Sequence, residues 1–259
     1  MSLRNIINGL KSLIALLTNI PVNANSIECA AHHFYLVPII GAIEGIIVSL
    51  VTWVLYIIRI ENVIISVLYP FFHLLVTGGI HLDGYADYSD VIGSHRTGEP
   101  AIKILKDPRK GTFAIVSTTL NLITSSTSMH LLLKLKDSTQ PFPLWLILIY
   151  ILSAESMYIT SFFGIEEPYE GLGKKFVSSA KISTNLVKNA IVMVLTYLPV
   201  LTLIYTEIHV AFTITLVTIA ASITVAIDAR RRLGFVNGDV MGFSYELTRV
   251  ICMVLTACI

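Results

Sequence analysis

The sequence predicts an all-α membrane protein, and its composition is the first reason. Hydrophobic residues make up 54% of the 259 residues, charged residues only 14%, and the mean hydropathy is +0.76. Soluble domains carry about 25% charged residues, so this chain has too few to cover a surface that faces water. The charges are also clustered, with long apolar runs between the clusters. We therefore expect a polytopic bundle of membrane-spanning helices.

Seven runs are long and apolar enough to cross a bilayer, which takes about 20 mainly apolar residues. The first thirty residues are too polar to span, and we expect residues 5–20 to form an interfacial or partly re-entrant helix. One membrane-embedded domain over residues 1–259, with residues 1–33 as its interfacial N-terminal segment, is the expected organisation. The seven runs are Phe34–Ile58, Asn62–Ile80, Thr112–Leu133, Phe142–Gly164, Asn189–Tyr205, Ile208–Ile227 and Met241–Ile259.

The positions of lysine and arginine predict the orientation in the membrane. If the N-terminus is inside, the inside segments hold fourteen of the 18 basic residues, and one more, Arg249, lies within the last run. This asymmetry follows the positive-inside rule and predicts a multi-pass protein of the cell membrane with residues 81–111 facing the cytoplasm. The inside segments are 1–33, 81–111, 165–188 and 228–240, and the outside basic residues are Arg59, Lys134 and Lys136.

Two observations exclude other classes of function. The net charge is only +1, so no overall field favours nucleic acid, and we expect no nucleic-acid partner. Cys29, Cys252 and Cys258 form no CxxC pair, so neither a zinc site nor a disulfide is expected.

Residues 77–100, TGGIHLDGYADYSDVIGSHRTGEP, place several acids directly after an apolar run. Asp83, Asp87 and Asp90 have the spacing i, i+4, i+7, which places them within about 60° of one helix face. Three carboxylates on one face repel each other unless a cation binds, and ligation by carboxylates alone favours Mg²⁺, Mn²⁺ or Ca²⁺ over zinc. Gly84 and Ala86 would let a phosphate approach closely. The alternative is a solvated acidic loop, but ionisable groups at membrane depth favour a functional metal site.

Two further segments lie on the same predicted side of the membrane as the aspartates of residues 77–100. In ILKDPRKGTF (104–113), Asp107 is a candidate metal ligand or base. The neighbouring basic residues are candidates for phosphate binding, but the same residues could simply be the positive flank of the following membrane span. In RRRLGFVNGDVMGFSYE (230–246), residues 237–239 predict a turn that brings Asp239 to this face. Glu246 adds an acid nearby, or pairs with Arg249 at i, i+3.

Acidic and basic residues at one membrane face predict transfer of a phosphoryl-type group. Metal ions would bind a diphosphate, stabilise its developing charge and orient a hydroxyl nucleophile. These residues alone do not identify the donor.

Four segments occur in an order that resembles a known family. They are TGGIHLDGYADYSD (77–90), LKDPRKGT (105–112), EGLG (170–173) and NGDVMG (237–242), with TNIPV (18–22) and VPIIGAIEG (37–45) before them. Over nearly the full chain the pattern is similar to that of the cobalamin 5′-phosphate synthases, or adenosylcobinamide-GDP ribazoletransferases. Two places depart from it: Ser153-Ala154 stands where the family usually has serine and arginine, and Asn237 where it usually has threonine.

The resemblance implies a reaction. The 3′-hydroxyl of α-ribazole, or of its 5′-phosphate, attacks the phosphorus attached to the cobinamide in adenosylcobinamide-GDP, and GMP leaves. Adenosylcobalamin or its 5′-phosphate is the product, and Mg²⁺ is the implied cofactor, with Mn²⁺ as a possible substitute.

We assign site roles on this basis. The expected metal ligands are Asp83, Asp87 and Asp107, and the expected base is Asp90, with Asp239 able to exchange roles with it. The expected phosphate-binding residues are Lys106, Arg109, Lys110, Arg230 and Arg231. The expected supporting residues are His81, Gly84, Asn237, Gly238 and Glu246.

Two other functions stay open, and so does the role of one glycine pattern. A CDP-alcohol phosphotransferase of lipid synthesis would use similar chemistry, although its usual motif places Asp-Gly three residues after a first aspartate. A cation transporter is compatible with intramembrane acids, but here the acids lie at the ends of spans and not at the midplane. Gly41 and Gly45 form a GxxxG pattern that brings helices together, either within the chain or between protomers of a homo-oligomer.

Overall fold

The computed structural model describes residues 3–24, 26–135 and 142–259, and within these ranges it contains helices and no strand. The all-α prediction is confirmed for this part of the chain. The α-helices are α1 (Leu3–Leu17), α2 (Ile27–His32), α3 (Val37–Ile57), α4 (Asn62–Thr77), α5 (Ile80–Ser94), α6 (Glu99–Leu105), α7 (Thr112–Leu135), α8 (Phe142–Phe163), α9 (Leu172–Ala180), α10 (Ser183–Leu203), α11 (Ile208–Arg232) and α12 (Gly238–Cys258), and the 3-10 helices are η1 (Phe34–Leu36) and η2 (Tyr205–Glu207).

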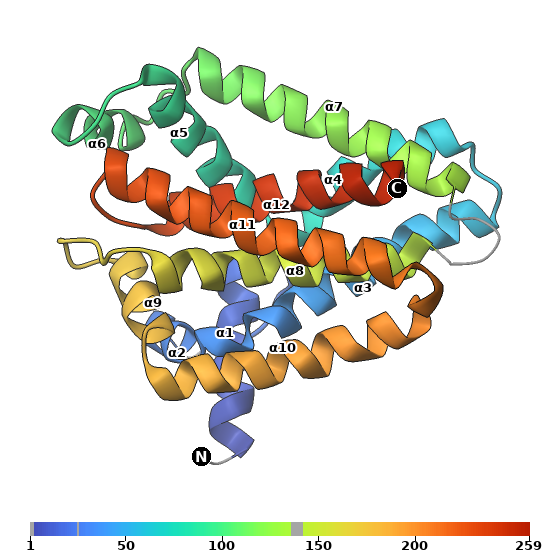
Figure 1. Ribbon diagram of the computed structural model, residues 1–259, viewed down its shortest axis with the longest axis horizontal. Helices are drawn as coiled ribbons and strands as arrows, with labels where there is room; N and C mark the ends of the chain where they lie inside the picture. Colours follow the sequence, from blue (N-terminus) through green and yellow to red (C-terminus); the bar gives the residue numbers. More distant parts are fainter. Residues whose placement is uncertain (1–2, 25, 136–141) are drawn as a thin grey trace.

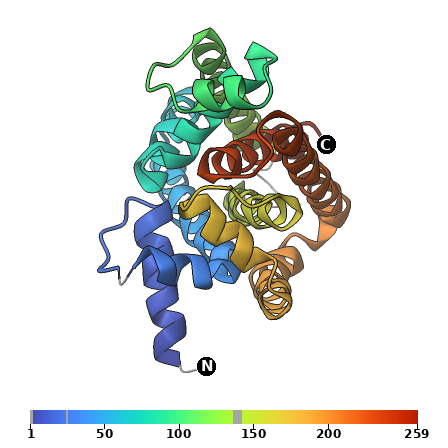
Figure 2. The ribbon, with the colours of Figure 1, turned by 90° about the vertical axis from the view of Figure 1, so that its left-hand side faces the viewer.

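The long helices lie side by side and run lengthwise in Figure 1, with α8 in the middle when the bundle is viewed from its left-hand end in Figure 2. Helix α8 contacts α3, α9, α10, α11 and α12, and most of its residues are buried. The short helices α6 and α9 both lie at the left-hand end of the bundle in Figure 1, where α5 also ends beside α6. The segments predicted to carry chemistry therefore gather at that end.

Five helices are long and apolar enough to cross a membrane, against the seven spans that the sequence predicts. They are α3 together with η1, α8, α10, α11 and α12, and there are six if the bent pair of α4 and α5 counts as one span. Helix α7 runs lengthwise beside them (Figure 1), but its many serines and threonines make it less apolar. The membrane bundle is supported, whereas the number seven is not confirmed.

The predicted span Asn62–Ile80 corresponds to α4, which ends at Thr77, and the chain then turns by 101° into α5. Gly78 and Gly79 both adopt left-handed backbone angles, with φ of 64° and 73°, which glycine tolerates best. The Asn19 N–H donates to the Val76 carbonyl oxygen at 2.7 Å, which satisfies an acceptor near the end of α4. The aspartate segment is therefore a separate helix, α5, which starts just after this turn.

Helix α1 crosses the direction of the bundle and does not run along it (Figure 1). Leu13 and Leu17 are buried against the bundle, whereas Leu3 is 72% exposed. A helix that lies across the spans with one apolar face has the form of an interfacial helix. The interfacial placement of residues 1–33 stays a prediction.

The GxxxG pattern is used inside the chain. A Cβ atom on Gly41 would lie 2.4 Å from the Tyr150 carbonyl oxygen, and one on Gly45 would lie 2.8 Å from the Ile147 Cα. These two glycines therefore let α3 and α8 pack backbone to backbone. They are not free for an interface between protomers.

A buried network of ion pairs and hydrogen bonds links α4, α7 and α12. The two Glu246 carboxylate oxygens pair with His73 Nε2 at 2.7 Å and with Arg249 at 2.7 Å. Arg249 also donates to Asn121 Oδ1 at 2.9 Å and to the Tyr69 hydroxyl at 3.3 Å. Glu246 and Arg249 are fully buried, so the predicted i, i+3 pair is present.

We expect Glu246→Leu to destabilise the protein by about 3–5 kcal/mol, because it leaves the guanidinium of Arg249 buried without a carboxylate. The measurement is the thermal unfolding midpoint in detergent, with exposed Arg230→Leu as the control. The double variant Glu246→Leu/Arg249→Met removes both charges and should recover much of the loss. Equal midpoints for the single and double variants would contradict this account.

The predicted orientation is testable because the basic loops lie at one end of the bundle. In a background without native cysteines, Arg96→Cys should react with a membrane-impermeant maleimide in inside-out vesicles and not in intact cells. Arg59→Cys, in the α3–α4 loop at the other end, should show the opposite pattern. The reverse result for this pair would place α5 outside.

Candidate active site

Two of the three aspartates on α5 converge on one cation. Asp83 Oδ1 accepts from Lys110 Nζ at 2.6 Å, and Asp87 Oδ1 accepts from the same amine at 2.5 Å. Burial lowers the pKa of Lys110, but the hydrogen bonds to Asp83 and Asp87 outweigh this effect, and the net shift is upward. As the spacing predicts, the two carboxylates share one face of α5. Lys110, predicted to bind phosphate, lies between them.

The third aspartate of the stripe, Asp90, binds backbone instead. Its Oδ2 accepts from the Gly111 N–H at 2.6 Å, and its Oδ1 accepts from the Ala114 N–H at 2.8 Å. Both oxygens thus cap the start of α7. Glycine is needed at 111, because a Cβ there would lie 2.6 Å from Asp90 Oδ1. Asp90 therefore fixes the loop that delivers Lys110.

Asp239 reaches the same place from the first turn of α12. The Asn237 side chain caps this helix by accepting from the Val240 N–H at 3.1 Å, and it donates to Asp239 Oδ2 at 2.8 Å. Gly84 of α5 packs directly on Asp239, since a Cβ on Gly84 would lie 2.8 Å from the Asp239 Cα. Asp239 also interacts electrostatically with Asp83, Asp87 and Lys110. Two carboxylates of α5 therefore share one lysine, and a third carboxylate, from α12, lies near them.

A cavity of about 240 Å³ opens beside these carboxylates. Asp83, Asp239 and His81 line one part of it, and the rest is mainly apolar, with walls from α1, η1, α8, α9 and α12. His81 is buried and stacks on Tyr245 with 4.1 Å between the ring centroids. The predicted supporting residues His81 and Gly238 thus both lie at the cavity.

A second hollow, of about 420 Å³, lies between α5 and α7, and Asp83 lines it as well. Its lining includes Asp83, Lys110 and Thr118, and it is more open than the first. Asp83 therefore borders both hollows, and its side chain is 63% exposed, which leaves it accessible to a ligand.

The loop before α7 meets the loop before α9. The Lys106 amine lies 4.5 Å from the centre of the Tyr169 ring. Burial raises the pKa of Glu167, and Lys106 partly offsets that rise. The LKDPRKGT segment thus lies against the residues that precede EGLG, which brings two of the quoted segments together.

Two predicted members of the site lie apart from the carboxylates. Arg109 Nη2 donates to Asp107 Oδ2 at 2.8 Å. This hydrogen bond lowers the pKa of Asp107 to about 2. Arg109 is 88% exposed. The Asp107–Arg109 pair lies at the surface, and it makes no contact with Asp83 or Asp87.

The basic end of α11 contributes differently from the prediction. Arg230 and Arg231 are exposed, and neither has an ion-pair partner in the described ranges. Arg232 instead binds Asp228 at 2.9 Å, and Asp228 accepts from the Tyr88 hydroxyl at 2.8 Å. This contact ties α11 to α5. Glu246 lies deeper in the bundle, in the ionic network.

The carboxylates form only part of a ligand set for a divalent metal. Among the described residues, no three histidine, cysteine, aspartate or glutamate side chains are already arranged to hold an ion. Asp83 and Asp87 nevertheless place one oxygen each within 2.6 Å of a single cationic atom, and Asp239 lies nearby. Carboxylates that already share one cation suit Mg²⁺ or Mn²⁺ chemically, provided that Lys110 withdraws.

Several residues of the site carry no recognisable signal in the sequence. Phe34, Phe176 and Leu17 form apolar walls of the cavity, yet each looks like ordinary core in the sequence. The hydrogen bond between Tyr88 and Asp228 joins residues far apart in the chain, so spacing does not indicate it. His73 also lacks a local partner, because Glu246 lies on another helix.

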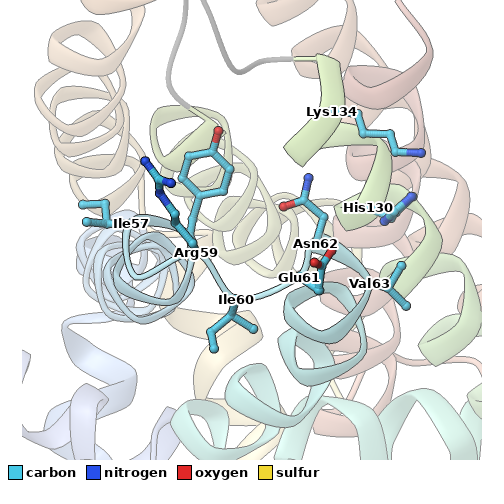
Figure 3. A pocket seen from close by; sticks show the side chains of 9 residues that line it. Ile57, Arg59, Ile60, Glu61, Asn62, Val63, His130 and Lys134 are labelled. Atoms are coloured by element: carbon cyan, nitrogen blue, oxygen red, sulfur yellow. The ribbon is translucent and has the colours of Figure 1, made fainter.

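A larger hollow, of about 810 Å³, lies away from this site, around the α3–α4 loop and the end of α7 (Figure 3). Its lining includes Arg59, Glu61, Asn62, His130 and Lys134. None of the predicted site residues borders it. Lys136, predicted for the same outer face, lies outside the described residues. This hollow is not the candidate active site.

Comparison with known proteins gives consistent matches. The chain is 31% identical over 244 residues to the adenosylcobinamide-GDP ribazoletransferase of Pyrobaculum aerophilum, covering 93% of this chain and 92% of that protein. The protein of the same name from Halorubrum lacusprofundi is 27% identical over 252 residues, 95% of each chain. That from Lachnoclostridium phytofermentans is 38% identical over 79 residues, which is 30% of each chain. No solved structure matches the chain.

A family model described as cobalamin-5-phosphate synthase matches residues 9–257. This range contains the aspartate helix, the loop with Lys110 and the start of α12, which together form the carboxylate cluster. The chain therefore belongs to the cobalamin-5-phosphate synthase family.

Proposed function

We propose that this protein transfers the adenosylcobinamide phosphate group from adenosylcobinamide-GDP to the 3′-hydroxyl of α-ribazole or α-ribazole 5′-phosphate. The family match and the names of the relatives support this reaction. The observation that carries it is the convergence of Asp83 and Asp87 on one cation, with Asp239 packed against the same helix, beside a cavity that Asp83 and Asp239 line. Such a cluster is suited to holding a diphosphate through a shared cation.

Asp83 and Asp87 are the proposed ligands of Mg²⁺, or of Mn²⁺ in substitution. When bound, the metal would neutralise the diphosphate and stabilise charge on the leaving phosphate. Lys110, displaced from the two carboxylates, remains within reach of the phosphate oxygens, and Lys106 and the exposed Arg109 add positive charge. Asp107 would join the ligands only if its pair with Arg109 opened.

Asp239 is the proposed general base. The hydroxyl oxygen of the acceptor forms a bond to the cobinamide phosphorus, the bond from that phosphorus to the GMP oxygen breaks, and the hydroxyl proton passes to the Asp239 carboxylate. Asp239 suits this role because Asn237 holds only one of its oxygens by a side-chain hydrogen bond. Asp90 suits it less, because backbone N–H groups bind both of its oxygens.

The site is proposed to face the cytoplasm of the cell membrane. Residues 95–111 and 165–188, which include α6, α9 and the loops beside them, are rich in basic residues, and Lys110 from this set binds the carboxylates, as expected for the inner side. Both substrates are large and polar, so a site at the membrane surface is accessible to them without a crossing.

Asp83→Asn and Asp87→Asn should each reduce GMP release by about 100-fold or more, because each removes charge that balances the cation. The assay uses detergent-purified protein, adenosylcobinamide-GDP and α-ribazole, with and without its phosphate, over a series of Mg²⁺ and Mn²⁺ concentrations. Chelation of the metal should abolish turnover, and Glu99→Gln, an exposed acid on the same side, should retain it. Full turnover in both aspartate variants would sink the metal assignment, and use of CDP-diacylglycerol as donor would favour the lipid enzyme.

Substitutions of the two candidate bases, Asp239 and Asp90, are expected to have different effects. Asp239→Asn should lower kcat while the thermal midpoint changes little, because it removes the proton acceptor. Asp90→Asn should lower the stability by about 1–3 kcal/mol, because an amide cannot accept from both the Gly111 and Ala114 N–H groups. If Asp90→Asn abolishes kcat with an unchanged midpoint, Asp90 is the base.

A further inference from the structure

The cavity beside the carboxylates has two chemically different parts. Asp83, Asp239 and His81 form the polar part. The opposite walls are apolar and partly aromatic, and the rings of Phe34 and Phe176 meet edge to face with 4.7 Å between centroids. Such walls suit a planar apolar group whose polar end reaches the carboxylates.

His81 also borders the cavity, but its ring is directed into the bundle. The residue is only 3% exposed and stacks on Tyr245, and its Nε2, which has no hydrogen-bond partner among the described residues, has almost no accessible surface. The polar side chains that the cavity offers to a ligand are therefore the carboxylates of Asp83 and Asp239.

Size decides which substrate the cavity takes. Its volume of about 240 Å³ lies below the range of about 300–1,000 Å³ typical of sites for drug-sized ligands. A two-ring heterocycle fits such a space, whereas a corrin macrocycle does not. The hollow between α5 and α7 is larger and more open, and it contains Lys110, which suits the donor's diphosphate.

We propose that the 240 Å³ cavity binds the planar aromatic base of the acceptor nucleoside, with the donor on the α5–α7 side of Asp83. This proposal rests on the proposed function. The ribose of the acceptor then lies at Asp83 and Asp239, with its hydroxyl facing the cation position. The acceptor hydroxyl would then reach the phosphorus from the cavity, with the GMP oxygen leaving on the opposite side of that phosphorus, as an in-line displacement requires.

Leu172→Trp tests the proposal because Leu172 lines the cavity and is 42% exposed, so a larger side chain fills the cavity without disturbing the core. The KM for α-ribazole should rise at least tenfold, while the KM for adenosylcobinamide-GDP stays within about twofold. Leu186→Trp, at an exposed leucine of α10 away from the cavity, is the matched control and should change neither value. Thermal midpoints of both variants exclude misfolding.

A second measurement needs no turnover. Isothermal calorimetry with benzimidazole, the bare two-ring system, should detect binding to the unsubstituted protein and at least tenfold weaker binding to Leu172→Trp. In kinetics, benzimidazole should compete with the acceptor and not with the donor. Competition with the donor, or a raised donor KM in Leu172→Trp, would overturn the proposal.

The failures of the two proposals are distinguishable. If the unsubstituted protein releases no GMP from adenosylcobinamide-GDP with either acceptor, the proposed function is wrong, and calorimetry still decides whether the cavity takes a planar base. If GMP is released normally and Leu172→Trp leaves the acceptor KM unchanged, only the cavity assignment fails.

Discussion

The sharp turn at Gly78-Gly79 is the constraint on which the site depends. A helix that continued straight from α4 would carry the aspartates along the bundle, away from the start of α12. Two successive left-handed glycines turn the chain by 101° instead, and Asn19 binds the Val76 carbonyl near the end of α4. Helix α5 then lies against α12, where Gly84 and Asp239 touch. The carboxylates thus meet because the backbone bends, and not because the sequence places them together.

The contact between α5 and α12 is close enough to fix the carboxylates in place. A Cβ on Gly242 would lie 3.0 Å from the His81 carbonyl oxygen, so the two backbones nearly touch on both sides of the cluster. Deeper in the bundle, Glu246 of α12 pairs with His73 of α4. Buried charges in a membrane protein are tolerated only when they are paired, so this network holds the helix before the turn to the helix that carries Asp239.

The features that were predicted from the sequence are those that depend on composition and on local spacing. Composition predicted the helical membrane bundle, and the spacing of Asp83 and Asp87 predicted their shared face. Spacing did not distinguish Asp90, because only the three-dimensional position of the α7 N-terminus shows that its oxygens bind backbone. The turn was missed because a Gly-Gly pair ends a helix without giving the direction of the next. The apolar cavity wall was missed because cavity and core select the same side chains.

The position of Lys110 links the observed geometry with the proposed reaction. Its amine binds one oxygen each of Asp83 and Asp87, and it neutralises two carboxylates that would otherwise repel each other. In the proposed function a divalent metal would need the same oxygens, so the lysine would have to leave them. The lysine cannot move far, because Asp90 holds the next residue, Gly111, by a hydrogen bond to its backbone. It would therefore stay beside the carboxylates, where it could bind a phosphate oxygen of the donor.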